Sequence, residues 1–140
     1  MREPLTYEIA FTAARNAIEF GRKDGWALCV VVVNRSGITK VLLADDGVGV
    51  LGVETARRKA YTSAASGKTT AQMASFAASP TMKYAPLHLV DSQLLPVAGG
   101  VPIVTTDGEI IGALGVGGAD DVTDGLIAGR AGDSVAELVG

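Results

Sequence analysis

Residues 98–118 read AGGVPIVTTDGEIIGALGVGG and contain seven glycines among β-branched residues. The runs VPIVTT and EIIGALGV flank Asp107-Gly108, a pattern that predicts a β-hairpin closed by a type I′ turn. Glycine is unfavourable inside strands unless another group must approach the main chain closely. The stretch therefore indicates a hairpin against which a ligand, a helix or a second subunit packs. Glycines that only accommodate bulges and turns are the alternative.

The pattern on either side of this hairpin predicts helices and antiparallel strands. Short turns join neighbouring strands, so the strand pairs are antiparallel and no βαβ unit is expected. The predicted fold class is α+β: a central antiparallel sheet with helices, in one domain spanning residues 1–140. The predicted elements are a helix over 5–23, strands over 26–33 and 38–44, helices over 50–66 and 69–80, a long loop over 79–100, the hairpin, and a helix over 120–139.

Composition excludes several function classes. The 140 residues carry a net charge of −3 and no basic run, so nucleic acid is not an expected partner. The N-terminal MREPLTYEIA lacks an apolar core of the kind found in signal peptides, and no run is long enough to span a bilayer. The single cysteine, Cys29, lies in an apolar strand and is expected to be inert. No membrane partner and a cytoplasmic location are therefore predicted.

The helix predicted over 50–66 carries the most informative polar residue, Lys59. On a helical wheel Lys59 lies in line with Thr55 and Thr62, away from the alanine stripe. Arg57 and Arg58 flank it, so this surface is locally cationic on an acidic protein. Such a strip can line a cleft and bind a carboxylate. An ordinary solvated lysine is the alternative.

Residues 47–52, GVGVLG, match the glycine pattern of dinucleotide-binding proteins. Asp45 and Asp46 directly precede the glycines, where they would repel a pyrophosphate. No strand is predicted after the following helix either. Dinucleotide binding is therefore not favoured.

His88 is the only histidine of the chain, so no multi-histidine metal site is possible and no metal site is predicted. It can serve as a general base or as an axial haem ligand. A histidine exposed on the loop over 79–100 is the favoured interpretation.

Two stretches carry a resemblance to a known family. DDGVGVLGVETARRKAYTSAASGKT, residues 45–69, followed by the hairpin over 98–118, resembles the GlcG/HbpS-like family, and the similarity extends from Leu5 into the last helix. The resemblance implies a profilin-like or PAS-like sandwich, in which helices flank a central five-stranded antiparallel sheet. It also implies binding of haem or a corrinoid and assembly into homo-oligomers. This chain has no histidine in the helices over 5–23 and 50–66.

The leading functional hypothesis is a small-molecule-binding protein whose ligand lies between the Lys59 helix and the Gly99-Gly100 segment. Haem or another tetrapyrrole or carboxylate-bearing molecule is the ligand that the family implies. Backbone N–H groups of the two glycines would bind an anion or stabilise an enolate. The candidate binding residues are Glu54, Thr55, Arg58, Lys59, Thr62, Gly99 and Gly100.

Two other hypotheses stay open. The first is a cofactor-independent enzyme, an isomerase, tautomerase or cyclase acting on a keto or enol compound, in which Lys59 or His88 moves a proton. The second is a purely structural subunit of an assembly. A line of small residues on the last helix, Gly125, Gly129 and Gly132, suits close packing against another backbone.

Overall fold

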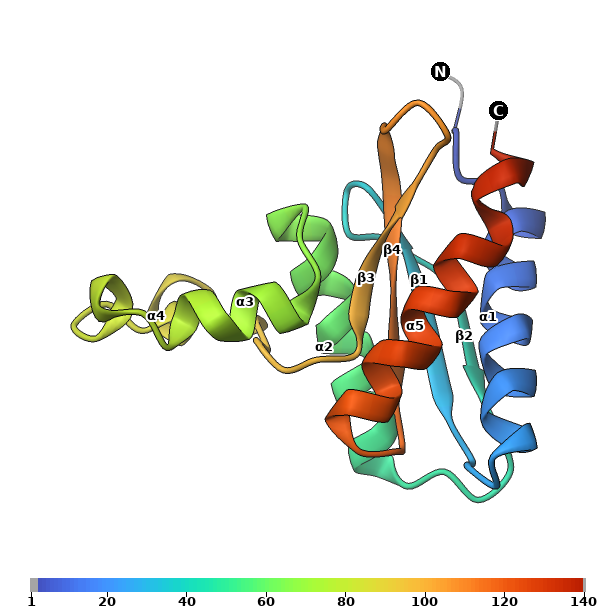
Figure 1. Ribbon diagram of the computed structural model, residues 1–140, viewed down its shortest axis with the longest axis horizontal. Coiled ribbons are helices and arrows are strands. Elements are labelled where there is room, and N and C mark those ends of the chain that lie inside the picture. The colour runs from blue at the N-terminus through green and yellow to red at the C-terminus, as the bar shows by residue number, and fades with distance from the viewer. Residues whose placement is uncertain (1–2, 140) are drawn as a thin grey trace.

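The computed structural model describes residues 3–139 and contains one antiparallel sheet with helices on both faces (Figure 1). The strands are β1 (Cys29–Asn34), β2 (Thr39–Ala44), β3 (Gly100–Val104) and β4 (Ile110–Gly117). The helices are α1 (Tyr7–Lys23), α2 (Val50–Ser66), α3 (Thr70–Ala77), α4 (Leu87–Val90) and α5 (Asp121–Val135), with short 3₁₀ turns η1 (Pro80–Met82) and η2 (Ala136–Leu138).

The sheet has four strands in the order β2-β1-β4-β3, and every neighbouring pair is antiparallel. The α+β class is thus confirmed, whereas the expectation of five strands is wrong for the described residues. The segment between α3 and β3 adds no strand. Pro80, Pro86 and Pro96 lack the N–H that a strand needs, and the segment folds into η1, α4 and irregular backbone. The profilin-like name stays a prediction.

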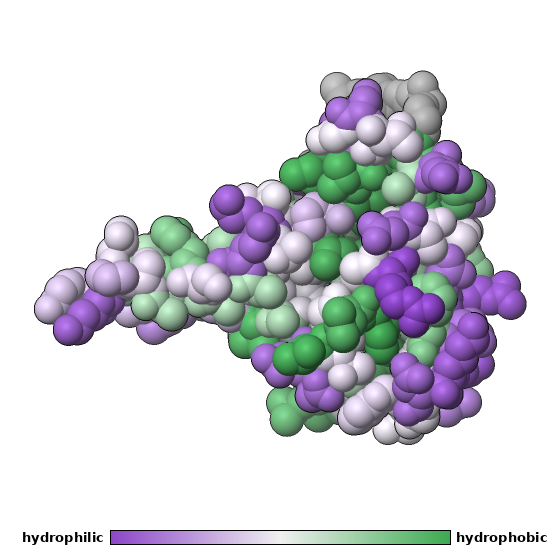
Figure 2. Space-filling view, in the orientation of Figure 1, coloured by the Kyte–Doolittle hydropathy of each residue, from purple (hydrophilic) through white to green (hydrophobic). Residues whose placement is uncertain are grey.

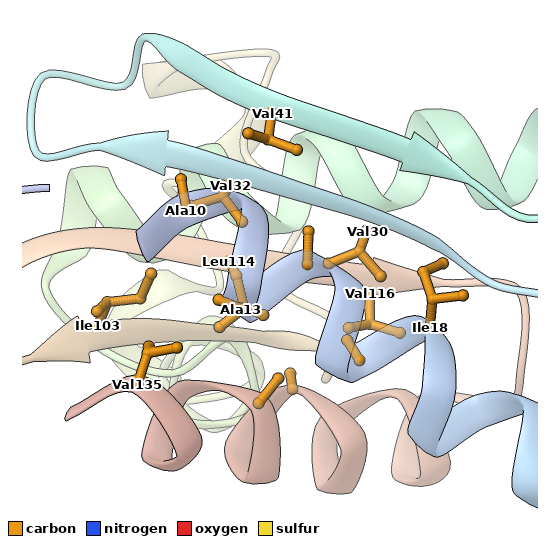
Figure 3. Close-up of a cluster of buried hydrophobic side chains, with 14 of the residues drawn as sticks. Ala10, Ala13, Ile18, Val30, Val32, Val41, Ile103, Leu114, Val116 and Val135 are labelled. Atoms are coloured by element: carbon orange, nitrogen blue, oxygen red, sulfur yellow. The ribbon is translucent and has the colours of Figure 1, made fainter. Parts of the chain in front are cut away.

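Strand β1 is buried on both faces, as its apolar sequence predicts. Val30 and Val32 point into a large core beneath α1 and α5, which Figure 3 shows between the helices and the sheet. Val31 and Val33 point the opposite way, into a smaller core beneath α2. Because the two faces need different helices, the sheet separates α2 from α1 and α5.

The two hairpin turns share a geometry that differs from the type I′ prediction. A type I′ turn needs positive φ at both central residues, but glycine alone adopts positive φ among the described residues. In the β3–β4 turn the Gly108 N–H donates to the Thr105 carbonyl (3.0 Å), and Gly108 has φ +90°. Gly37 closes the β1–β2 turn in the same way. Both are type I turns that end in a glycine bulge.

The glycines of β4 allow α2 to lie directly on the strand. A Cβ at Gly115 would come within 2.1 Å of the Ala56 carbonyl oxygen, and one at Gly117 within 2.2 Å of the Gly52 oxygen. No side chain fits between strand and helix at these two positions. The sequence left three candidates for the group that packs against the hairpin's glycines: a ligand, a helix or a second subunit. At Gly115 and Gly117 that group is helix α2.

Residues 79–97, together with α3, form an arm that projects from the body of the protein (Figure 1). Several large apolar side chains on it are exposed, among them Tyr84 (86%), Leu89 (72%) and Val90 (76%). These side chains have no core of their own to enter. Across residues 3–139, none of the helices combines the length and the apolarity that a bilayer span requires.

Candidate functional site

Lys59 is buried, not solvated. Only 3% of the residue is exposed, and its Nζ donates to the Asp124 carboxylate and to the Val116 carbonyl, each at 3.1 Å. Lys59 belongs to α2 and Asp124 to α5, which cover opposite faces of the sheet. The predicted carboxylate partner of Lys59 is therefore a residue of the chain itself.

Gly99 makes room for this ion pair. A Cβ there would lie 2.7 Å from both Cδ and Nζ of Lys59, so any side chain would block the path of the lysine. The φ of Gly99 is +135°, a conformation that favours glycine. Gly99 lies just before the edge strand β3, where the Lys59 side chain reaches from α2 toward α5. The sequence predicted a ligand between the Lys59 helix and this glycine, but here the Lys59 side chain packs directly against Gly99.

Gly100 also contributes to the packing of α2 and α3 against β3. Its N–H donates to the Thr70 hydroxyl at 2.8 Å, and a Cβ there would meet the Lys59 carbonyl oxygen at 2.5 Å. The prediction that the Gly100 N–H is a free donor for an anion is therefore wrong. The packing of α2 and the start of α3 against β3 uses that group.

Asp124 is 2% exposed and is held from two sides. One carboxylate oxygen accepts from Lys59 and the other from the Ala119 N–H at 3.0 Å. Burial raises the pKa of Asp124, and the attraction of Lys59 opposes that rise. The pair therefore brings a cation and an anion, neutralising each other, to the end of the sheet where α2 and α5 begin.

A cavity of about 580 Å³ opens at this pair. Its walls are the loop over 47–49, the first half of α2, the turn over 118–121 and the side chains of Leu95 and Val97. Lys59 and Asp124 form its charged floor, and Asp121, which is exposed, stands on the same wall as Asp124. The volume lies within the range of pockets that bind small molecules.

The glycine pattern over 47–52 forms one wall of the cavity at the start of α2. Gly49 is the N-cap and provides no side-chain hydrogen bond, and the first turn of α2 contains no acidic residue. The first N–H groups of such a helix lack partners within the helix. Since all strand pairs are antiparallel, the crossover of a dinucleotide-binding fold is absent from residues 3–139.

Of the other predicted binding residues on α2, only Thr55 lines this cavity. Glu54 accepts from the Arg57 guanidinium (2.6 Å), which lowers the pKa of the Glu54 carboxyl. Arg58 lies outside the cavity lining, and its buried Nε has no partner. Thr62 accepts from the Leu95 N–H at 2.8 Å, so it positions a cavity wall without facing the ligand space.

Two further contacts fasten the same wall to α2. Arg57 donates to Gln93 at 3.0 Å, and the Tyr61 hydroxyl donates to Asp91. Together with the bond from Leu95, they hold the chain over 91–97 along α2. The polar face of α2 thus positions the end of the arm that carries Leu95 and Val97.

His88 is exposed on α4, which belongs to the projecting arm (Figure 1). It does not line the cavity. The structure therefore does not bring together the two residues predicted to move protons, Lys59 and His88. Within residues 3–139, no three His, Cys, Asp or Glu side chains are grouped so as to hold a metal ion.

Sequence reasoning missed Asp124. The signal was present, because Asp124 is in phase with Ala128, Ala131 and Val135, which form the buried face of α5. A carboxylate in the apolar stripe of a helix needs a partner of opposite charge. Lys59 was the candidate cation, but the distance of 65 residues between the two hides the pairing.

Residues 5–132 match the family model described as "Haem degrading protein HbpS-like". The chain belongs to the HbpS-like family. No curated protein matches it.

Solved structures of the HbpS-like fold align with nearly the whole chain. A double mutant of HbpS from Streptomyces reticuli is 39% identical, with a TM-score of 0.79, over 95% of this chain and 87% of that one. Protein ORFY from Klebsiella pneumoniae is 26% identical, with a TM-score of 0.83, over 91% and 88%. A structure described as a PduOC:heme complex is 25% identical, with a TM-score of 0.83, over 97% and 96%.

Proposed function

We propose that this protein binds a carboxylate-bearing small molecule, a tetrapyrrole in the first instance, in the cavity above Lys59 and Asp124. The observation that carries the proposal is a buried ammonium on the floor of an open, ligand-sized cavity. The family supports the ligand class, because its model describes a haem-degrading protein and one relative is described in complex with heme.

The cavity residues fit the carboxylates of a haem but not its iron. Proteins ligate haem iron with His, Cys, Met or Tyr side chains. None of these lines the cavity, and the Lys59 amine is engaged by Asp124 and Val116. The ammonium can instead bind a propionate, so recognition in this cavity depends on the edge of the ligand and not on its metal.

The single tryptophan provides the assay. Trp26 is the neighbour of Ala27, which lines the cavity, so a bound tetrapyrrole should quench its fluorescence. Haemin and metal-free protoporphyrin IX are titrated in parallel. We expect both to quench Trp26 saturably with similar Kd values. A Kd for haemin far below that of the metal-free porphyrin would contradict recognition without iron ligation.

A plugged variant tests the location. Val97 lines the cavity and is 37% exposed, so Val97→Phe should fold and reduce the space. We expect it to raise the Kd of the porphyrin by about tenfold or more. Ile38→Phe introduces the same aromatic side chain at a position 61% exposed on the β1–β2 turn and serves as the control. Equal affinities of the Val97→Phe variant and the wild type would refute binding in this cavity.

The enzyme hypothesis gains no support from the site, because His88 and Lys59 lie apart. We propose instead that copies of the chain associate through the projecting arm. Its exposed apolar side chains are not covered by any part of residues 3–139. Figure 2 also shows apolar residues gathered beside the base of the arm, where exposed Val122 and Leu126 border a hollow of about 300 Å³. A second copy could cover both surfaces. The cytoplasmic location stays a prediction.

A further inference from the structure

Three ionisable side chains line the cavity, and the signs of their charges determine which charged ligand groups it can bind. They are Lys59, Asp121 and Asp124. Lys59 on α2 is the only one of these that is cationic, and the loop over 47–49 and the chain at 95–97 add no charge to the lining. Asp120, the N-cap of α5, is the other carboxylate acting on Asp124. An anionic ligand group must therefore bind at Lys59 in the presence of Asp124.

The Lys59 ammonium has one N–H left for a ligand. An ammonium carries three donors, and in the described structure two of them go to Asp124 and Val116. The residue is nine-tenths buried, so a ligand that accepts the third bond does so in a weakly screened environment. In the same weakly screened environment, the negative charge of Asp124 repels an acidic group of that ligand.

We propose that Asp124 competes with the acidic group of the ligand for Lys59, so that this cavity binds its ligand more tightly when Asp124 is protonated. The proposal rests on the proposed function and adds a regulation of the same site. With Asp124 ionised, its charge already neutralises Lys59 and repels a second carboxylate. With Asp124 neutral, the ammonium is left to the ligand.

The sign of the pH dependence follows from burial. Burial raises the pKa of Asp124 above the value of an exposed aspartate, so this carboxyl takes up a proton earlier than others as the pH falls. Affinity for an anionic ligand therefore increases as the pH falls through the pKa of Asp124. Asp121 is an exposed carboxylate of the same cavity lining and lies outside the ion pair of Lys59 and Asp124.

The test compares protoporphyrin IX with its dimethyl ester, which lacks the carboxylates, on the wild-type protein. As the pH is lowered from 8 through the pKa of Asp124, the affinity ratio of acid to ester should increase. Properties that the two porphyrins share, such as stacking on the apolar wall, cancel in the ratio. A ratio that stays constant or decreases would overturn the proposal. This comparison needs only the wild-type protein.

Two variants sharpen the result. Asp124→Asn should bind the acid about tenfold more tightly than wild type at pH 8, and this advantage should shrink as the pH falls through the pKa of Asp124. Asp121→Asn is the matched control, because it removes a carboxylate from the same cavity lining and leaves the pair of Lys59 and Asp124 intact. An Asp124→Asn variant that binds the acid no more tightly at pH 8 refutes the competition. The proposed function fails separately, if Val97→Phe leaves porphyrin binding unchanged.

Discussion

Replacing Lys59 by methionine tests the ion pair on which the site depends. Methionine keeps the unbranched stem but leaves Asp124, 2% exposed, without its counter-charge. Removing one partner of a buried pair costs about 3–5 kcal/mol, because the remaining charge is uncompensated. The Asp124 carboxyl can avoid that penalty by taking up a proton. The free energy of this protonation is therefore an upper limit on the penalty for the unpaired charge.

This upper limit on the penalty depends on pH. Protonating a carboxyl whose unfolded pKa is 3.8 costs about 1.36 kcal/mol for each pH unit above that value. The limit is therefore about 4 kcal/mol at pH 7 and about 1.6 kcal/mol at pH 5. Lys59→Met should lose much of its stability relative to wild type at pH 7 and considerably less at pH 5.

Urea unfolding followed by circular dichroism, at both pH values and one protein concentration, measures these losses. The control is the double variant Lys59→Met/Asp124→Leu, which contains neither charge. We expect its free energy of unfolding at pH 7 to lie close to that of wild type. A loss in Lys59→Met that is equal at pH 5 and pH 7, or a double variant as unstable as the single one, would refute the reasoning.

Three further predictions concern the packing and the surface. Gly115→Ala should lower the free energy of unfolding by about 1–3 kcal/mol or more, because the methyl group meets the backbone of α2; an unchanged urea midpoint would contradict the contact. Burial raises the pKa of Cys29 to about 11, so a thiol reagent at pH 8 should modify this residue only after unfolding. Leu89→Ser/Val90→Ser should reduce the mass seen by light scattering without changing the circular dichroism spectrum, and an unchanged mass would exclude this part of the arm as the contact between copies.

The parts of the fold that could be predicted are those with strong local signals. Helix α2 begins and ends where its sequence predicts, and β1 lies within one to three residues of its predicted bounds. The type I′ turn could not be distinguished from a type I turn with a bulge, because Asp107-Gly108 suits both and only the backbone conformation separates them. The fifth strand came from the resemblance, whereas the prolines of the arm argue against a strand.

The candidate site was predicted only in part. The polar strip of α2 led to Lys59 and Thr55, which do line the cavity. Thr62 shares that strip and Glu54 is the neighbour of Thr55 in the chain, yet Thr62 holds Leu95 and Glu54 pairs with Arg57. A helical wheel shows which residues share a face but not what packs against that face, so these different roles could not be separated.

By itself, the sequence determined the class of fold, the helix that carries Lys59 and the need for bare backbone in the second hairpin. Each follows from short-range rules, namely periodicity, propensity and the steric freedom of glycine. Only the tertiary structure decided that α2 covers the glycines of β4 and that Lys59 passes Gly99 to reach Asp124. The reason is physical: a buried charge is stable only beside its partner, and which partner that is depends on how the sheet brings α2 and α5 together.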